Sequence, residues 1–167
     1  GLPQISVSDY KNKFCFPIQN YWRILGFTFT DRDFHKMNTE FILRYKKQMF
    51  LPQPHPGIRS LFLLLKKKEI SQFVVSASEH SLLKSSVKHY GLHNYFCDFK
   101  GVNNFFAEGK VDLAVNLKNN YFSSIKNIFV VGDSLQDLSV ARSLCATPLL
   151  VSYGHYAKHR LVGNDNV

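Results

Sequence analysis

The sequence is poor in cysteine and in acidic residues, and it has no long apolar run. Its three cysteines, Cys15, Cys97 and Cys145, form neither a CxxC pair nor a zinc-ligand spacing. This pattern argues against a disulfide framework and predicts reduced thiols in a cytoplasmic protein. The densest apolar run, residues 61–65, ends in three lysines. It is far shorter than the roughly 20 residues of a membrane helix, so we expect no membrane span.

Twelve acidic residues face 21 basic ones, which gives the 167-residue chain a formal net charge of +9. The lysines are scattered, apart from the run 66–68 at the end of an expected helix, where positive charge complements the helix dipole. No nucleic-acid-binding motif accompanies the charge. A basic surface would equally attract a small phosphorylated substrate, and we favour that partner over nucleic acid. The sequence does not indicate an oligomeric state.

Three prolines within residues 51–57 divide the chain into two parts of different pattern. The first part predicts helices, whereas in the second short apolar strands alternate with helices. Such alternation is typical of a doubly wound parallel sheet, an α/β fold with helices on both faces. We therefore expect a helical cap domain over residues 1–52 and a Rossmann-like α/β core over residues 53–167. The expected helices are 9–14, 17–25, 30–49, 56–65, 79–90, 111–117 and 135–144, and the expected strands are 72–75, 97–101, 128–131 and 149–151.

Polar residues follow two of the expected strands, at the sheet edge where such folds bind ligands. Ser76 and Ala77 follow the first strand, Asp133 follows the third, and Asp137 comes four residues later. Lys110 lies between them in the sequence. A hydroxyl and an ammonium can hold phosphate oxygens, and carboxylates can hold Mg²⁺.

Each of these residues also has a plainer interpretation. A serine after a strand commonly forms a turn, and an isolated lysine is usually solvated. Asp133 and Ser134 could simply cap the helix that begins at Leu135. The order and the spacing of the whole set, rather than any single residue, favour a phosphate site.

The same residues resemble motifs II, III and IV of the haloacid dehalogenase superfamily, which here would be Ser76, Lys110 and the stretch Val130-Val131-Gly132-Asp133-Ser134-Leu135-Gln136-Asp137. The chain looks most like phosphoglycolate-phosphatase-like members that carry a helical cap, and the resemblance covers nearly all of it.

The resemblance implies a role for each matching residue. Ser76, with Ala77 beside it, would bind the transferring phosphoryl group, and Lys110 would neutralise the charge on that group. Asp133 would bind Mg²⁺ and Asp137 would support the metal shell. Gly154-His155 looks like a late loop that borders the site, which makes His155 a candidate substrate-side residue.

The family's first motif, Asp-x-Asp-x-Thr at the end of a central strand, has no counterpart. The single Asp-x-Asp is Asp31-Arg32-Asp33, which is followed by Phe34-His35 in place of Gly-Thr. Thr30 and Asp33 fit better as the cap of a helix. We expect that a segment carrying the missing strand has been lost from the N-terminal side or is supplied by another chain. Natural loss of the motif is the alternative.

The expected function is that of a Mg²⁺-dependent phosphomonoester hydrolase acting through an aspartyl-phosphate. Because the family's nucleophile is the first aspartate of the absent motif, we expect the 167 residues alone not to be catalytically competent. A catalytically inactive binding or scaffold protein, as part of a larger basic assembly, is the rival hypothesis.

Overall fold

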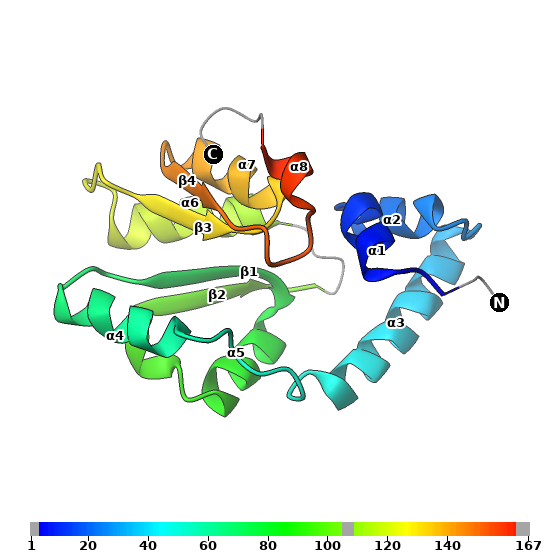
Figure 1. Ribbon diagram of the computed structural model, residues 1–167, viewed down its shortest axis with the longest axis horizontal. Coiled ribbons are helices and arrows are strands. Elements are labelled where there is room, and N and C mark those ends of the chain that lie inside the picture. Colours follow the sequence, from blue (N-terminus) through cyan, green and yellow to red (C-terminus); the bar gives the residue numbers. More distant parts are fainter. Residues whose placement is uncertain (1–3, 105–108, 163–167) are drawn as a thin grey trace. The chain divides into compact units, whose positions relative to one another are not determined.

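The computed structural model describes residues 4–104 and 109–162, which divide into two compact units. One unit joins residues 1–28 to residues 109–167, and the other comprises residues 29–108. Figure 1 labels the elements. The first unit contains α1 (Val7–Lys13), α2 (Ile18–Ile24), α6 (Lys110–Tyr121), β3 (Phe129–Gly132), α7 (Leu135–Ser143), β4 (Thr147–Leu150) and α8 (Lys158–Leu161). The second contains α3 (Asp31–Gln48), α4 (Ile58–Lys67), β1 (Phe73–Glu79), α5 (His80–His89), the short 3₁₀ helix η1 (His93–Tyr95) and β2 (Asp98–Val102).

In the first unit, β3 and β4 pair in parallel, and α7 packs against both strands. Three α7 residues, Leu138, Val140 and Ala141, are at most 3% exposed. On the opposite face of this sheet no described residue of the first unit covers Phe129 or Val131, which are 61% and 66% exposed. Strand alternation places these two side chains on the same face.

Helices α1 and α2 form a second, largely aromatic core with the C-terminal segment of the same unit. Phe14 and Tyr21 are buried together with Tyr156 and Leu161. Arg160 donates from Nη1 to the Phe14 carbonyl at 2.8 Å and to the Lys11 carbonyl at 2.9 Å. The guanidinium thus binds two carbonyls at the end of α1, where helical carbonyls have no partner within the helix, and the Lys11 carbonyl also accepts from the Ala157 N–H at 3.2 Å.

In the second unit, β1 and β2 pair in parallel and α5 packs against both. Gly101 of β2 permits a close approach, because a Cβ there would lie 2.5 Å from the Ser78 carbonyl oxygen. Helix α3 begins with the expected cap: Thr30 and Asp33 exchange hydrogen bonds in a capping box. The Asp-x-Asp sequence therefore opens a helix and does not end a strand.

The expected helices and strands occur in the expected order, with the short helices η1 and α8 in addition, and the α/β class with parallel strands is confirmed. Several bounds are corrected: β1 runs to Glu79 instead of ending at 75, so Ser76 lies inside the strand, and β4 is Thr147–Leu150 instead of 149–151. Pairing with β2 continues past an irregularity between Ser76 and Glu79, which an apolar pattern cannot reveal. Helix α6 is also longer than the expected range 111–117. It begins at Lys110, directly after Gly109, whose φ lies in the left-handed region, and it continues through polar residues to Tyr121.

The boundary expected between residues 52 and 53 falls inside the second unit, so α1 and α2 group with the C-terminal elements while α3 groups with α4 and α5. The assignment of residues 1–52 as a cap stays a prediction. No helix in the described part of the chain is long and apolar enough to cross a membrane.

Packing of α7 on the sheet should dominate the stability of the first unit. Leu138→Ala removes a side chain that is 3% exposed, and we expect it to cost about 2–5 kcal/mol of unfolding free energy. Ser139→Ala, on the exposed face of the same helix, is the matched control and should change stability by less than about 1 kcal/mol. Urea unfolding of both variants measures the difference, and equal effects would contradict this packing.

Candidate active site

The carboxylate of Asp137 lies at the centre of a hydrogen-bond network at the end of β3. Its Oδ2 accepts from the backbone N–H of Asp133 and of Ser134, both at 3.0 Å, and from Ser134 Oγ at 2.7 Å. Ser134 is the N-cap of α7 and forms a capping box with Asp137. Gly132 makes room for this arrangement, because a Cβ there would lie 2.1 Å from Asp137 Cγ.

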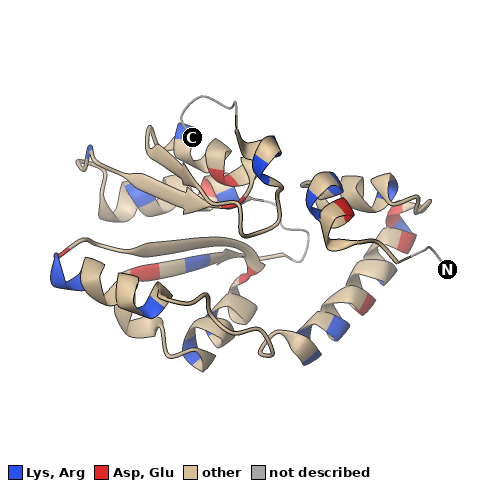
Figure 2. Ribbon diagram, viewed as in Figure 1, with Lys and Arg blue, Asp and Glu red and all other residues tan. Residues whose placement is uncertain are grey.

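Lys110 reaches the other oxygen of the same carboxylate. Its Nζ lies 2.5 Å from Asp137 Oδ1, and the side chains are 14% and 5% exposed. Lys110 is the first residue of α6, directly after Gly109. The ion pair therefore joins the start of α6 to the start of α7. Figure 2 shows that basic residues otherwise occur along every α-helix rather than in one stripe.

Burial and charge act in opposite directions on Asp137. Burial by itself would raise the pKa of this carboxyl, but the Lys110 ammonium and the hydrogen bonds from Ser134 and Asp133 hold it below its usual value. The group is therefore ionised throughout the neutral range. Both of its oxygens already have protein donors, which suits a residue that orients Asp133 better than one that binds a metal directly.

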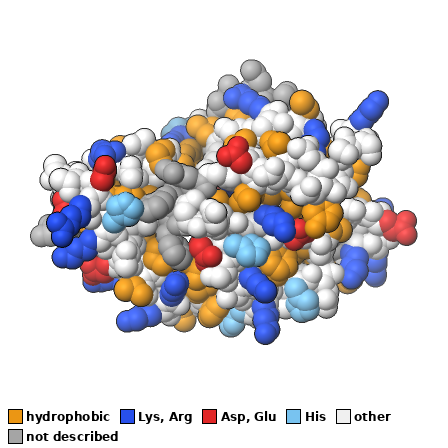
Figure 3. All heavy atoms as spheres, turned by 180° about the vertical axis from the view of Figure 1, so that it is seen from behind, with side chains coloured by type: hydrophobic (Ala, Val, Ile, Leu, Met, Phe, Trp, Pro, Cys, Tyr) orange, Lys and Arg blue, Asp and Glu red, His pale blue; other side chains and the backbone are white. Residues whose placement is uncertain are grey.

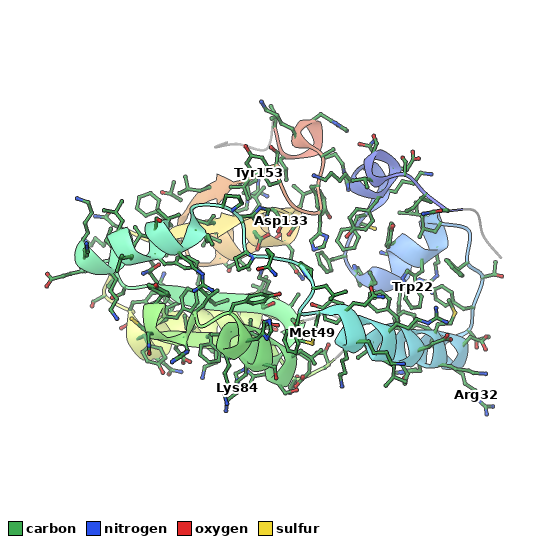
Figure 4. The ribbon with its side chains drawn as sticks, turned by 60° about the horizontal axis from the view of Figure 1, so that its bottom comes forward. Trp22, Arg32, Met49, Lys84, Asp133 and Tyr153 are labelled. Carbon is green, nitrogen blue, oxygen red and sulfur yellow. The ribbon has the colours of Figure 1, made fainter. Side chains whose placement is uncertain are left out.

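Asp133 has the more open carboxylate. It lies where β3 ends (Figure 4), and its Oδ2 accepts from the His155 backbone N–H at 2.5 Å. Gly154 permits this approach of the loop, since a Cβ there would lie 1.8 Å from Asp133 Oδ2. Within the described residues, Oδ1 of Asp133 has no protein partner.

The described residues contain no cluster of three or more metal-ligating side chains. Mg²⁺ nevertheless fits the donor set, because it commonly takes one or two carboxylates, several waters and a substrate phosphate rather than an all-protein cage. Asp133 supplies the open oxygen, and Asp137 holds Asp133 in place through its backbone.

An aromatic group from the N-terminal helices borders the Asp133 loop. The hydroxyl of Tyr10 in α1 is hydrogen-bonded to Nδ1 of His155, and the Phe14 ring stacks on the His155 ring with centroids 4.7 Å apart. Burial, reinforced by Tyr21 and Asp133, raises the pKa of Tyr10 to about 12. Sequence reasoning missed Tyr10, since no local pattern links a residue in α1 to a loop near the other end of the chain.

Of the expected site residues, the first unit brings together Lys110, Asp133, Asp137 and His155. Ser76 and Ala77 belong to the other unit, so their joining this site stays a prediction. The Ser76 hydroxyl accepts from the Ser78 N–H at 3.0 Å, which is the turn-like contact that the plainer interpretation expects.

Two further groups of candidate residues lie elsewhere in the chain. His159 lies in α8, whereas His155 precedes that helix in the chain, so the two do not form a metal-binding helical face. Asp31 and Asp33 begin α3 in the second unit.

The Lys110–Asp137 pair should give the protein a characteristic acid sensitivity. Because the folded pKa of Asp137 is depressed, its stabilising effect is complete above the unfolded pKa of about 3.9 and is lost as pH falls through the lower folded value. Asp137→Asn leaves Lys110 buried without its charge partner, and we expect a loss of about 3–5 kcal/mol at pH 7.

The difference in unfolding free energy between the wild type and Asp137→Asn should shrink when both are unfolded by urea below pH 3.5. Asp112→Asn, at an exposed position in the first turn of α6, serves as the control and should have little effect at either pH. A deficit in Asp137→Asn that does not change with pH would contradict the ion pair.

The solved structures most informative for this chain are three proteins of related fold. A haloacid dehalogenase-like hydrolase from Streptococcus pneumoniae matches 90% of this chain and 70% of its own, with a TM-score of 0.77 and 16% identity. The protein tyrosine kinase A of Mycobacterium tuberculosis matches 100% of this chain and 76% of its own, with a TM-score of 0.78 and 14% identity. A predicted phosphatase from Clostridium acetobutylicum matches 67% of this chain and 52% of its own, with a TM-score of 0.59 and 21% identity.

At such low identities these likenesses establish the fold alone. No curated protein matches the chain. The family model for haloacid dehalogenase-like hydrolases, however, matches residues 1–150, which is most of the sequence. The chain belongs to the haloacid dehalogenase-like hydrolase family.

Proposed function

We propose that this chain carries the metal-binding carboxylate and the phosphate-binding lysine of a Mg²⁺-dependent phosphomonoester hydrolase, similar to phosphoglycolate phosphatases. The observation that supports this most directly is the buried Lys110–Asp137 pair beside the open carboxylate of Asp133. A fixed cation next to a cation-binding carboxylate suits a phosphoryl group, whose negative charge both can offset. Three free cysteines agree with a cytoplasmic setting.

In this proposal each residue has a distinct task. Lys110 donates one of its three N–H groups to Asp137, and the other two bind phosphoryl oxygens. Asp133 holds Mg²⁺ through Oδ1, and Asp137 keeps the turn that carries Asp133 in place. Ser76 and Ala77 keep the phosphoryl-binding role that the family resemblance implies. Mg²⁺, when bound, would offset charge on the phosphoryl oxygens.

The nucleophile would lie on a strand that is not among these residues. Each of β1 and β3 pairs with a single neighbour in the described part of the chain, so each has a free edge. Exposed apolar side chains on β3 and β4, among them Phe129 and Leu149, mark a face that a further layer of chain would cover, which is a separate feature from the free edge. We propose that a strand ending in the family's Asp-x-Asp motif completes the sheet and supplies the aspartate that becomes phosphorylated.

The rival is a catalytically inactive binding or scaffold protein. The Asp137 network also caps α7, so it would serve the fold even without catalysis. Apolar surface between basic side chains, as in Figure 3, would then be a protein contact. Metal binding and turnover separate the two hypotheses.

Mg²⁺ binding tests the role of Asp133 in the 167-residue chain itself. Asp133→Asn removes the open carboxylate charge, and we expect Mg²⁺ affinity measured by calorimetry to fall at least tenfold, because hard cations prefer charged oxygen ligands. Asp112→Asn removes an equal charge from an exposed site of the same unit and should leave binding unchanged. Equal loss in both variants would mean non-specific attraction.

Turnover tests Lys110 in a chain extended by a strand that bears the Asp-x-Asp motif. Lys110→Ala should lower phosphomonoester hydrolysis at least a hundredfold, since one preorganised contact to developing charge is worth about 3 kcal/mol. Lys126→Ala removes an exposed lysine and should leave the rate within error. Extended protein that binds Mg²⁺ but shows no turnover with any phosphomonoester would favour the inactive rival.

A further inference from the structure

We infer that Tyr10 holds His155 in the tautomer that carries its proton on Nε2, so that His155 donates a hydrogen bond to an oxygen acceptor of the substrate. The inference rests on the proposed function and adds to it a substrate-selecting pair. It stands on contacts within the first unit, where α1 meets the loop that carries His155.

The direction of the Tyr10–His155 hydrogen bond follows from what the phenol can otherwise do. Among the described residues the Tyr10 hydroxyl has no other hydrogen-bond partner. If His155 donated from Nδ1, the half-buried phenolic proton would be left without an acceptor, which is unfavourable. A phenol at neutral pH keeps its proton, so Tyr10 donates and Nδ1 accepts. The imidazole proton is therefore on Nε2.

The position of the ring is fixed from two further sides. The His155 backbone N–H is bound to Asp133 Oδ2, and the ring stacks on Phe14. Arg160 ties the end of α1 to the same C-terminal segment. A ring held in this way keeps its free Nε2–H in a fixed direction, and the backbone of the same residue is bound to the carboxylate proposed to hold Mg²⁺.

Nε2 of His155 has no protein partner in the described part of the chain, and the residue is exposed. An N–H donor recognises an oxygen acceptor, either a phosphoryl oxygen or a carboxylate on the leaving group. Lys11 of α1 donates from Nζ to the Ser152 carbonyl at 3.4 Å, which brings a positive charge to the loop that carries His155. This charge favours an anionic acceptor.

The tautomer can be read directly by long-range ¹H–¹⁵N NMR of the histidine rings, with His155 assigned from the signal lost in His155→Gln. The wild-type chain should show the Nε2–H form. Tyr10→Phe keeps the ring that packs on Phe14 and Tyr21 but removes the donor, and should give a mixture of tautomers. Tyr45→Phe, which removes an exposed hydroxyl from the other unit, should not move the signals. An Nδ1–H form in the wild type would overturn the inference.

Ligand binding tests whether His155 contacts the substrate. Three probes are used in the presence of Mg²⁺: inorganic phosphate, ethyl phosphate and phosphoglycolate. His155→Leu should weaken binding about tenfold, as expected for a lost hydrogen bond to a charged acceptor. Tyr10→Phe should weaken binding less, in proportion to the fraction of the Nε2–H tautomer that is lost. A loss confined to phosphoglycolate identifies the carboxylate as the acceptor, whereas an equal loss for all three identifies a phosphoryl oxygen. His155→Gln retains a side-chain N–H, and Tyr10→Phe should have no further effect in that background.

Lys110→Ala distinguishes failure of this inference from failure of the proposed function. Loss of binding in Lys110→Ala without any loss in Tyr10→Phe or His155→Leu would overturn the role of His155 and keep the phosphate site. If the wild-type chain binds none of the three probes, the proposed site and the substrate contact both fail.

Discussion

The site depends on the contacts that the buried carboxylate of Asp137 makes. One oxygen takes three donors from the turn after β3, and the other takes Lys110 from the start of α6. A carboxylate that is 4% exposed would be strongly unfavourable without these partners. The turn, the start of α7 and the start of α6 are therefore fixed together, and Asp133 is presented at the strand end as a consequence.

A second layer of contacts extends this order to the N-terminal helices. The His155 N–H binds Asp133, the Tyr10 hydroxyl binds the His155 ring, and Arg160 caps the end of α1. Gly154 is needed because any larger residue would overlap Asp133. Residues near both ends of the sequence are therefore linked to the carboxylate of Asp133, and α1 is connected to the site through Tyr10 and His155.

Structural features that depend on residues close together in the sequence could be predicted from local sequence patterns. The apolar run before Gly132 predicted β3, and Ser134 before Leu135 was a candidate cap of α7, because strand burial and capping act over a few residues. Thr30 and Asp33 predicted the start of α3 for the same reason. The Tyr10–His155 contact and the continuation of β1 past Ser76 depend on partners distant in sequence. No periodicity of the chain contains that information, so these features escaped prediction.

One disagreement between pattern and structure has a physical consequence. Val130 and Val131 belong to a continuous apolar run, which is typical of a strand covered on both faces, yet Val131 is 66% exposed and Phe129 is 61% exposed. β3 also has one edge that pairs with nothing in the described residues, and such an edge invites another strand. A strand added at this edge would pair it, and in the proposed function it would also bring a carboxylate to the phosphoryl group beside Asp133. The exposed face is a separate feature, because a strand at the edge only extends the sheet, whereas a face is covered by a further layer of chain.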